Sequence, residues 1–332
     1  MGLYQSVENG LTTTETFLQA CKKPKADTTL HSLSYYMLTG RHDCHVYRDE
    51  SALLVVCQHP HKKNHLLVFP EIGDGDGSLT CNVLRDLHNN GKQIQLARYT
   101  KDDFDLILRV LDPSRSDLIE SLEIFREDSL DWTYPVHILS TEAMSKREGK
   151  AFQNLRSACN RVEKDFDTVS AIDLAHPDAQ KYMKYVQKLW EAQMIFMDKE
   201  TMDISSYYNE LFNLTQLAPE KYTGLIFIAD DQPVGYTIAE IVSPKDAVGL
   251  ANICDTRIKK MAAYQAAKLC EHLNEQGIEK LNIGGSETKG LNDSKISNYR
   301  PSESIELLSA RVRYKTDKPL FAKHQLSSPS FV

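Results

Sequence analysis

The sequence lacks long apolar runs, paired cysteines and a secretory signal. No stretch approaches the roughly 18 consecutive apolar residues of a membrane-spanning helix. The first 20 residues contain no basic segment followed by an apolar one, so we expect no signal peptide and a cytoplasmic location. The seven cysteines form no Cys-x-x-Cys pair, which favours reduced thiols over a disulfide framework. The histidines and cysteines between His42 and His65 lack a recognised zinc spacing, so we expect no metal and no cofactor.

The length and the charge distribution indicate two unlike halves. A chain of 332 residues with 41% hydrophobic and 26% charged residues is long enough for two globular domains. We expect these domains at 1–130 and 131–332. Residues 1–140 contain 14 Lys and Arg against 20 Asp and Glu, which accounts for 6 of the 7 net negative charges. Because an acidic surface repels nucleic acid, any contact with RNA is expected from the second half.

A basic segment follows a short apolar strand at 136–139. Ser140 begins a helix, Gly149 interrupts it, and a second helical pattern follows. From 146 to 164 there are six Lys and Arg against two Glu. Helical spacing places Arg156 and Asn160 on one face, with Arg161 one step around the helix. This face indicates a binding site for an anionic group, and a solvated surface helix is the alternative.

This segment resembles the signature of the phosphatidylglycerol lysyltransferase C-terminal domain family. The matching residues are Gly149-Lys150, Arg156 and Asn160-Arg161, whereas Leu155 and Ser157 depart from the family's Lys and Asn. A second resemblance covers 282–301, where the matches are Asn282, Gly290-Leu291, Lys295, Ser297 and Tyr299-Arg300-Pro301. The Arg-Glu pair that follows the family's Asn is absent. The Gly284-Gly285-Ser286 run found there is more similar to the related Fem-like peptidyl transferases.

The order of the expected elements is typical of GNAT acyltransferase domains, an α+β fold. The first half reads as strands at 43–58, 65–69 and 93–98 with helices from Ser78 and at 101–111. The second half reads as helices at 142–166, 176–197 and 204–218, strands at 222–229, 233–241 and 248–254, a helix at 258–275 and a strand at 280–283. Gln232-Pro233 is expected to form the turn between two of these strands. The resemblance likewise implies two tandem GNAT-like domains, with the first a degenerate copy.

The identity of the acyl donor can be argued from one missing feature. GNAT domains that use CoA bind its pyrophosphate with a glycine-rich loop at a helix N-terminus. The corresponding segment 255–263 has no glycine but has Arg257, Lys259 and Lys260. This favours aminoacyl-tRNA, the donor that the resemblance implies, over CoA. We therefore expect an aminoacyltransferase acting on the amine or hydroxyl of a soluble small molecule, peptide or natural-product intermediate. A CoA-dependent N-acyltransferase and a non-catalytic binding or regulatory module remain alternatives.

The candidate site residues follow from this interpretation. Glu240 and Asp255, at strand ends, would bind or deprotonate an amine, and Tyr299 would protonate the leaving oxygen. Strand-end carboxylates in water and structural packing of the tyrosine are the alternatives. Backbone N–H groups near Asn252–Cys254 would stabilise the oxyanion. The expected donor- and substrate-binding residues are Lys150, Arg156, Asn160, Arg161, Asn252, Arg257, Asn282, Lys295 and Arg300.

Overall fold

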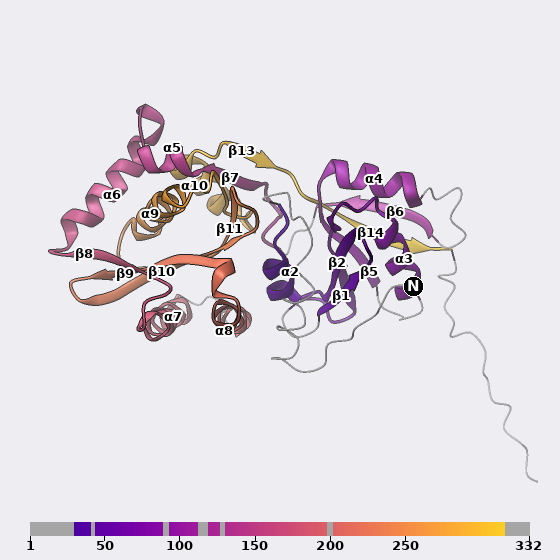
Figure 1. The fold of residues 1–332 in the computed structure, drawn as a ribbon, viewed down its shortest axis with the longest axis horizontal. Helices are drawn as coiled ribbons and strands as arrows, with labels where there is room; N and C mark the ends of the chain where they lie inside the picture. Colours follow the sequence, from indigo (N-terminus) through magenta and orange to yellow (C-terminus); the bar gives the residue numbers. More distant parts are fainter. Residues whose placement is uncertain are drawn as a thin grey trace, which may run out of the picture.

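Two mixed sheets of seven strands lie side by side along the molecule, which is an α+β fold (Figure 1). The computed structural model describes residues 30–40, 44–88, 93–111, 119–126, 130–197 and 202–315. The first sheet has the order β1-β2-β3-β5-β14-β6, with β4 paired to β2. Its strands are β1 (Cys44–Arg48), β2 (Ala52–Gln58), β3 (His65–Val68), β4 (Ile72–Gly73), β5 (Gln93–Tyr99), β6 (Ile119–Phe125) and β14 (Leu308–Tyr314).

The second sheet has the order β13-β7-β12-β11-β10-β9-β8. Its strands are β7 (Val136–Ser140), β8 (Val169–Asp173), β9 (Tyr222–Ala229), β10 (Gln232–Ile241), β11 (Asp246–Cys254), β12 (Lys280–Asn282) and β13 (Glu303–Ile305). One face is covered by α5 (Thr141–Lys146), α6 (Gln153–Asp165) and α9 (Met261–Glu275), whose apolar residues form one core cluster. The other face is covered by α7 (Ala179–Phe196) and α8 (Met202–Leu217), so the second half has three layers (Figure 1).

The two sheets repeat one arrangement. In the first, β3 and β5 are parallel and are joined by α3 (Ser78–Leu87). In the second, β11 and β12 are parallel and are joined by α9. In the first sheet, β14 lies antiparallel beside β5, and β6 pairs with β14. In the second sheet, β7 lies antiparallel beside β12, and β13 pairs with β7. The two sheets therefore share one strand arrangement, as the GNAT-like interpretation predicted, although β14 is the last strand of the described chain and β7 is the first strand of its sheet.

The strand β14 connects the end of the described chain to the first sheet. It pairs with β5 and β6, although the sequence division assigned it to the second half. Ala310, Val312 and Tyr314 alternate along it and are buried in the core of the first sheet. No strand was predicted at 308–314, and alternation does not show which sheet a strand joins, so the sequence did not reveal this exchange.

The helix α2 (Leu33–Gly40) lies between the two sheets and was not expected from the sequence. Tyr36, Met37 and Leu38 share one core cluster with residues of β2 and β10. The Tyr36 ring stacks on Phe69 with centroids 4.1 Å apart. A continuous apolar core therefore joins the two halves through α2. Two further helices, α4 (Lys101–Leu111) and α10 (Lys289–Tyr299), complete the pattern.

Most local predictions are confirmed, and one turn was misplaced. The Ser140 hydroxyl accepts a hydrogen bond from the Ala143 N–H at 3.2 Å and so caps α5, as expected. The turn between β9 and β10 lies at Asp230–Asp231, not at Gln232-Pro233, which already belong to β10. Both aspartates have positive φ (45° and 62°), the conformation of a tight hairpin turn. Along the described residues, no helix combines the length and apolarity needed to cross a bilayer.

Candidate functional site

An opening between β11 and β12 is the central feature of the second sheet. The two strands pair over only three residues, Asp246–Val248 with Lys280–Asn282. Beyond this point the described register pairs β11 with β10 alone, as far as Cys254. The strand therefore presents one backbone edge at 249–254, where the sequence predicted oxyanion donors. Backbone N–H groups at such an edge can stabilise a developing oxyanion.

Asp255 lies at the end of this opening, and its carboxylate is held by several hydrogen bonds. Its carboxylate accepts hydrogen bonds from Arg257 Nε (2.9 Å) and Nη2 (2.6 Å) and from Gln193 Nε2 (2.7 Å). Burial opposes ionisation, but the hydrogen bonds from Arg257 and Gln193 outweigh it, so the pKa of Asp255 is lowered. The Arg257 guanidinium is largely exposed (71% for the side chain). Asp255 therefore fixes the direction of Arg257 and is not a free base.

The N-terminus of α9 follows directly. Lys260 adopts the left-handed conformation (φ 70°) immediately before the helix, and no side chain caps the helix. The loop thus has a backbone path for which glycine is usually needed, although 255–263 contain none. Asn252 Nδ2 donates to the Ala262 carbonyl at 3.1 Å. Burial raises the pKa of the neighbouring Cys254 thiol to about 12, so it remains protonated.

The equivalent helix start in the first sheet is closed by carboxylates. Gly77 precedes α3, again in the left-handed conformation (φ 88°), at the end of a glycine-rich turn. Glu71 accepts hydrogen bonds from the N–H groups of Gly77 (3.1 Å) and Thr80 (2.7 Å). The Asp76 carboxylate accepts one from the Ser78 N–H at 3.0 Å. These carboxylates occupy the place where a helix N-terminus binds phosphate. At the start of α9 no side chain caps the helix, but the N–H groups of Met261 and Ala263 already donate to the carbonyls of Ile258 (3.3 Å) and Lys260 (3.1 Å).

Lys295 and Asn282 stabilise the turn after β12. Lys295 Nζ donates to the carbonyl oxygens of Ile283 (2.9 Å), Gly284 and Gly285. Burial lowers the pKa of Lys295. The buried Asn282 Oδ1 accepts the Gly284 N–H at 2.7 Å. Both predicted binding residues are thus bound to the backbone of the turn.

Tyr299 and Arg300 end α10. Tyr299 packs against the core cluster beneath α9, and burial raises its pKa above the usual range. Arg300 has φ 50°, and its Nε donates to the Ala151 carbonyl at 3.2 Å. This bond connects the end of α10 to the 3-10 turn Lys150–Phe152, which precedes α6 and in which Lys150 is exposed.

Glu240 lies away from the opening. It pairs across the sheet with Val248, whereas the Asp255 N–H donates to the Val234 carbonyl at 2.8 Å. Six residues of strand separate Val234 from Glu240, or about 20 Å. The two carboxylates therefore cannot act on one amine, contrary to the expectation that both strand ends line one cleft. Antiparallel neighbours end at opposite edges of a sheet, which explains the error.

The Glu240 carboxylate instead holds the start of α2. It accepts hydrogen bonds from the hydroxyls of Ser32 and Ser34, the latter at 2.8 Å. Glu240 is 6% exposed, and burial raises the pKa of its carboxyl group. The helix N-terminus and the two hydroxyls compensate a charge that burial disfavours. Glu240 is an anchor between the two halves.

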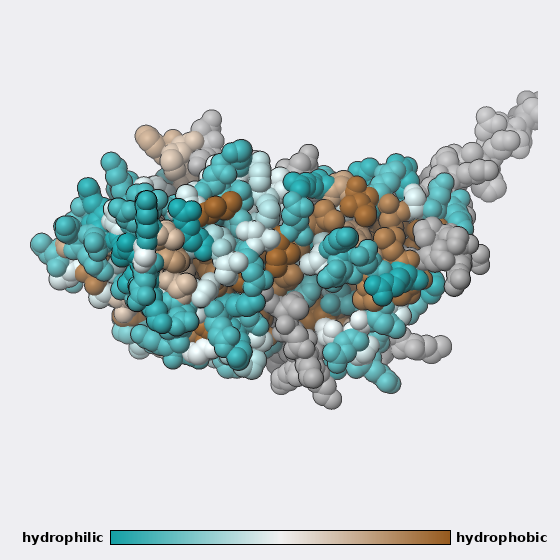
Figure 2. Space-filling view, turned by 90° about the horizontal axis from the view of Figure 1, so that it is seen from above, coloured by the Kyte–Doolittle hydropathy of each residue, from teal (hydrophilic) through white to brown (hydrophobic). Residues whose placement is uncertain are grey.

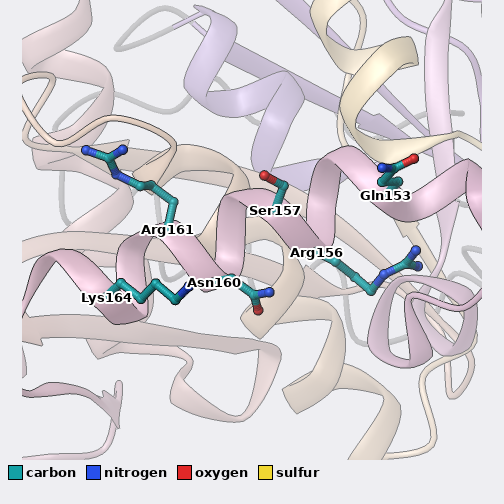
Figure 3. Close-up of a pocket in the computed structure, with 6 residues that line it drawn as sticks. All are labelled: Gln153, Arg156, Ser157, Asn160, Arg161 and Lys164. Carbon is teal, nitrogen blue, oxygen red and sulfur yellow. The ribbon is translucent and has the colours of Figure 1, made fainter.

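The predicted basic face is present on α6 and lines a hollow of about 500 Å³. Its lining forms two rows at i, i+4 spacing, Gln153–Ser157–Arg161 and Arg156–Asn160–Lys164 (Figure 3). Arg156 Nη1 donates to the carbonyls of Arg147 and Gly149, the latter at 2.8 Å, which holds it beside the hollow. Figure 2 shows that the surface on this side of the second half is mostly hydrophilic. We call these six residues the α6 groove.

A buried charge centre at the junction of the two halves was not anticipated. Arg98 is 4% exposed and has φ 63°. Its guanidinium carbon lies 4.1 Å from the centroid of the Tyr35 ring and 5.6 Å from that of Trp132. The Tyr35 hydroxyl donates to the Asp131 carboxylate. These residues are far apart in sequence, so no local pattern could identify the centre.

Other residues that the sequence reasoning missed are Gln193, which bonds the loop after β11, and Glu71. For Glu71, the glycine run before α3 was a usable signal of a phosphate-binding type of turn, but it was interpreted only as a turn. Among the described residues, no three His, Cys, Asp or Glu side chains gather as metal ligands. His42 lies outside the described residues.

Comparisons with solved structures identify proteins with this fold. A conserved protein of unknown function from Bacteroides thetaiotaomicron has a TM-score of 0.72 at 15% identity, covering 94% of this chain and 100% of that one. The C-terminal domain of a putative lysylphosphatidylglycerol synthetase from Agrobacterium fabrum has a TM-score of 0.63 at 12% identity, covering 90% of this chain and 91% of that one. FemX has a TM-score of 0.59 at 10% identity, covering 92% of this chain and 97% of that one.

The chain shares their fold. The similarity extends over nearly the whole of each protein, including both sheets, and agrees with both resemblances found in the sequence. Identities of 10–15% establish the fold alone. No protein-family model and no curated protein matches the sequence.

Proposed function

We propose that the protein is an acyltransferase that moves an aminoacyl group from aminoacyl-tRNA to an amine or hydroxyl of a small molecule or peptide. The acceptor nitrogen or oxygen attacks the ester carbonyl carbon and the bond to the tRNA 3′-oxygen breaks. The proton of the acceptor passes to that oxygen. No oxidant, reductant or further co-reactant is needed, so the step requires only positioning, oxyanion stabilisation and proton transfer.

The observation that carries the proposal is the α6 groove. It combines Arg156, Arg161 and Lys164 with three polar side chains, Gln153, Ser157 and Asn160, along the exposed side of α6. Arg161 pairs with Asp165 at 2.5 Å, but both side chains are exposed, so the pair is weak and phosphate can displace it. Such a surface suits the repeated phosphates of an RNA end better than a single small anion.

The opening beside β11 is where we place the transfer. The start of α9 lies there without a side-chain cap, and Arg257, Lys259 and Lys260 in the preceding loop supply the positive charge. In the other copy of the fold, Glu71 closes this place, so we assign the reaction to the second copy. Asp255 then acts by orienting Arg257 toward a donor phosphate, and Asn252 holds the start of α9 through the Ala262 carbonyl. Glu240, Lys295 and Asn282 act as structural supports.

A binding experiment tests the donor. The full chain is titrated with charged tRNA, deacylated tRNA and acetyl-CoA, with thermal stability as the readout. We expect stabilisation by charged tRNA, and its loss in Arg161→Gln/Lys164→Gln. The matched control Lys184→Gln/Lys188→Gln, on the opposite side of the sheet, should bind as the wild type does. Equal tRNA binding by both double variants would refute the role of the α6 groove.

A CoA-dependent N-acyltransferase is the second candidate. It is favoured by the left-handed Lys260 before α9, because this backbone path resembles that of a phosphate-binding loop despite the absence of glycine. Stabilisation by acetyl-CoA but by no tRNA would establish this reading and overturn the first. No stabilisation by either would favour a non-catalytic binding module.

A further inference from the structure

Arg98 lies at the opening of the first sheet, at the place that corresponds to the opening between β11 and β12 in the second. The parallel strands β3 and β5 pair as far as Val68 with Leu96, and Arg98 follows two residues later. Gly284 follows the last pair of β11 and β12 by the same two residues. Both have the left-handed conformation, with φ 63° for Arg98 and 68° for Gly284. Arginine is strained in this conformation, which glycine adopts freely, and such strain is typical of functional sites.

The guanidinium of Arg98 is buried beside two aromatic rings. Its carbon lies 4.1 Å from the centroid of the Tyr35 ring and 5.6 Å from that of Trp132. Among the residues that the structure describes, Arg98 makes no ion pair, and its Nε–H donates to no acceptor. Burial disfavours the charged form, but the nearby Tyr35 and Asp131 outweigh it, so the pKa of Arg98 is raised. A charged, buried guanidinium whose Nε–H has no acceptor is suited to bind a carboxylate.

Asp131 supplies a negative charge at the other end of the Tyr35 side chain. The Tyr35 hydroxyl donates to one oxygen of its carboxylate, whereas the Arg98 guanidinium lies over the Tyr35 ring. The second oxygen faces the turn 283–286, since a Cβ built on Gly284 would lie 3.6 Å from it. Tyr35 and Asp131 are partly exposed, so a small molecule can reach them from solvent. A positive and a negative group therefore lie on either side of one tyrosine.

Tyr207 connects this pair of charges to the opening of the second sheet. Its hydroxyl donates at 3.1 Å to the carbonyl of Leu250, on the edge of β11 that lies beyond the pairing with β12. Burial, with the nearby Tyr208 and Asp131, raises the pKa of Tyr207. The turn that Asp131 faces follows β12 directly. Asp131 therefore lies beside the opening from the side of both strands.

We propose that Arg98 and Asp131 bind the acceptor, and that the acceptor is a small molecule of the α-amino acid class with a free carboxylate and an ammonium group. The carboxylate would accept hydrogen bonds from the Arg98 guanidinium, and the ammonium would donate to Asp131 beside the opening. An aminoacyl ester has no free carboxylate, so Arg98 favours an acceptor over the aminoacyl part of the donor. The role of acceptor rests on the proposed function, whereas the binding site itself does not.

The transfer to such an acceptor balances without a further reactant. The acceptor nitrogen forms an amide bond to the ester carbonyl carbon while the bond from that carbon to the tRNA 3′-oxygen breaks. The ammonium group loses two protons, of which one ends on the 3′-oxygen and the other passes to water. Arg98 fixes the acceptor at its carboxylate, and Asp131 directs the nitrogen toward the opening.

Isothermal titration calorimetry of the full chain with each standard amino acid, in the absence of tRNA, tests the site. We expect one or a few amino acids to bind, and the methyl ester and the N-acetyl derivative of each to bind about tenfold more weakly. Arg98→Lys should weaken binding about 10- to 100-fold, because lysine cannot form the bidentate contact, and Asp131→Asn about tenfold. The matched control Arg311→Gln, which changes an exposed arginine on β14 of the same sheet, should bind as the wild type does.

Three results would overturn this inference. The first is that no standard amino acid binds, and the second is that Arg98→Lys and Asp131→Asn bind as the wild type does. The third is that a derivative binds as tightly as its free amino acid, since an ester would assign the site to the donor's aminoacyl part and an N-acetyl compound to anions in general. If circular dichroism shows that Arg98→Lys does not fold, Asp131→Asn and the two derivatives decide. Amino acid binding by a chain that binds no tRNA would refute the proposed donor and support this site.

Discussion

Replacing Gly285 by alanine should destabilise the protein strongly, whereas the same change at Gly290 should not. A Cβ on Gly285 would meet the Asp131 carbonyl oxygen and would lie 2.5 Å from that of Tyr134 and 3.1 Å from the Trp132 Cα. All three are backbone atoms of the segment that connects the halves, so no side-chain rotation relieves the overlap. The segment must move away from the turn 283–286.

The magnitude follows from what that movement breaks. Overpacking in a well-packed site costs about 1–3 kcal/mol. The bond from the Tyr134 N–H to the Ser286 carbonyl, 3.0 Å long, would also be lost, for about 1 kcal/mol more. We therefore expect Gly285→Ala to lower the free energy of unfolding by about 3 kcal/mol.

Gly290 supplies the matched control. It lies in the first turn of α10, and a Cβ there meets no atom within 4 Å. Alanine in a helix is favoured over glycine, so Gly290→Ala should raise the free energy of unfolding by about 0.5 kcal/mol. Urea denaturation of the three proteins measures both changes. A Gly285→Ala change below about 0.5 kcal/mol, or changes of the same sign in both variants, would refute the reasoning about this contact.

Three further predictions concern Glu240, Gln193 and the α6 groove. Burial raises the pKa of Glu240, so the wild type should lose stability as the pH rises from the usual glutamate pKa through the raised value. Denaturation curves from pH 4 to 8 give the free energy of unfolding at each pH, and in Glu240→Gln this free energy should not show the Glu240-dependent fall with rising pH. The same pH dependence in both proteins would contradict the prediction. Gln193→Ala removes the acceptor of the Thr256 N–H (2.8 Å), so that amide should exchange faster with deuterium while those of β10 do not change. Unaltered exchange at Thr256 would show that the contact is dispensable. For Arg161→Gln/Lys164→Gln, the dependence of log affinity for tRNA on log salt should fall by about 1.4, since each lost phosphate contact removes about 0.7; an unchanged slope would place the RNA elsewhere.

The sequence predicted the elements well because their signals are local. The alternation of apolar residues identified β9, β10 and β11, and helical spacing identified α6 with the side-by-side arrangement of Arg156 and Asn160. The same reasoning found the order of elements in the second half, and hence the α+β GNAT-like class, whereas α2 and β6 of the first half were missed. Each of these inferences depends on a few neighbouring residues and on the periods of helix and strand.

Site predictions failed where they depended on partners distant in sequence. Glu240 and Asp255 were both recognised as strand-end carboxylates, yet they end neighbouring antiparallel strands and lie about 20 Å apart. Lys295 was expected to bind the donor or the substrate, but its ammonium donates to three carbonyls of the preceding turn. Which donors and acceptors a buried charge finds is decided by packing.

The sequence by itself determined most helices and strands of the second half, the α+β class and the basic face of α6, because hydrophobic periodicity and charge are properties of short segments. Only the tertiary structure decided that β14 completes the first sheet, that Glu71 closes the first copy's helix N-terminus and that no side chain caps α9 in the second. Those outcomes depend on which surfaces exclude water together and which buried polar groups find partners, and these are properties of the folded whole.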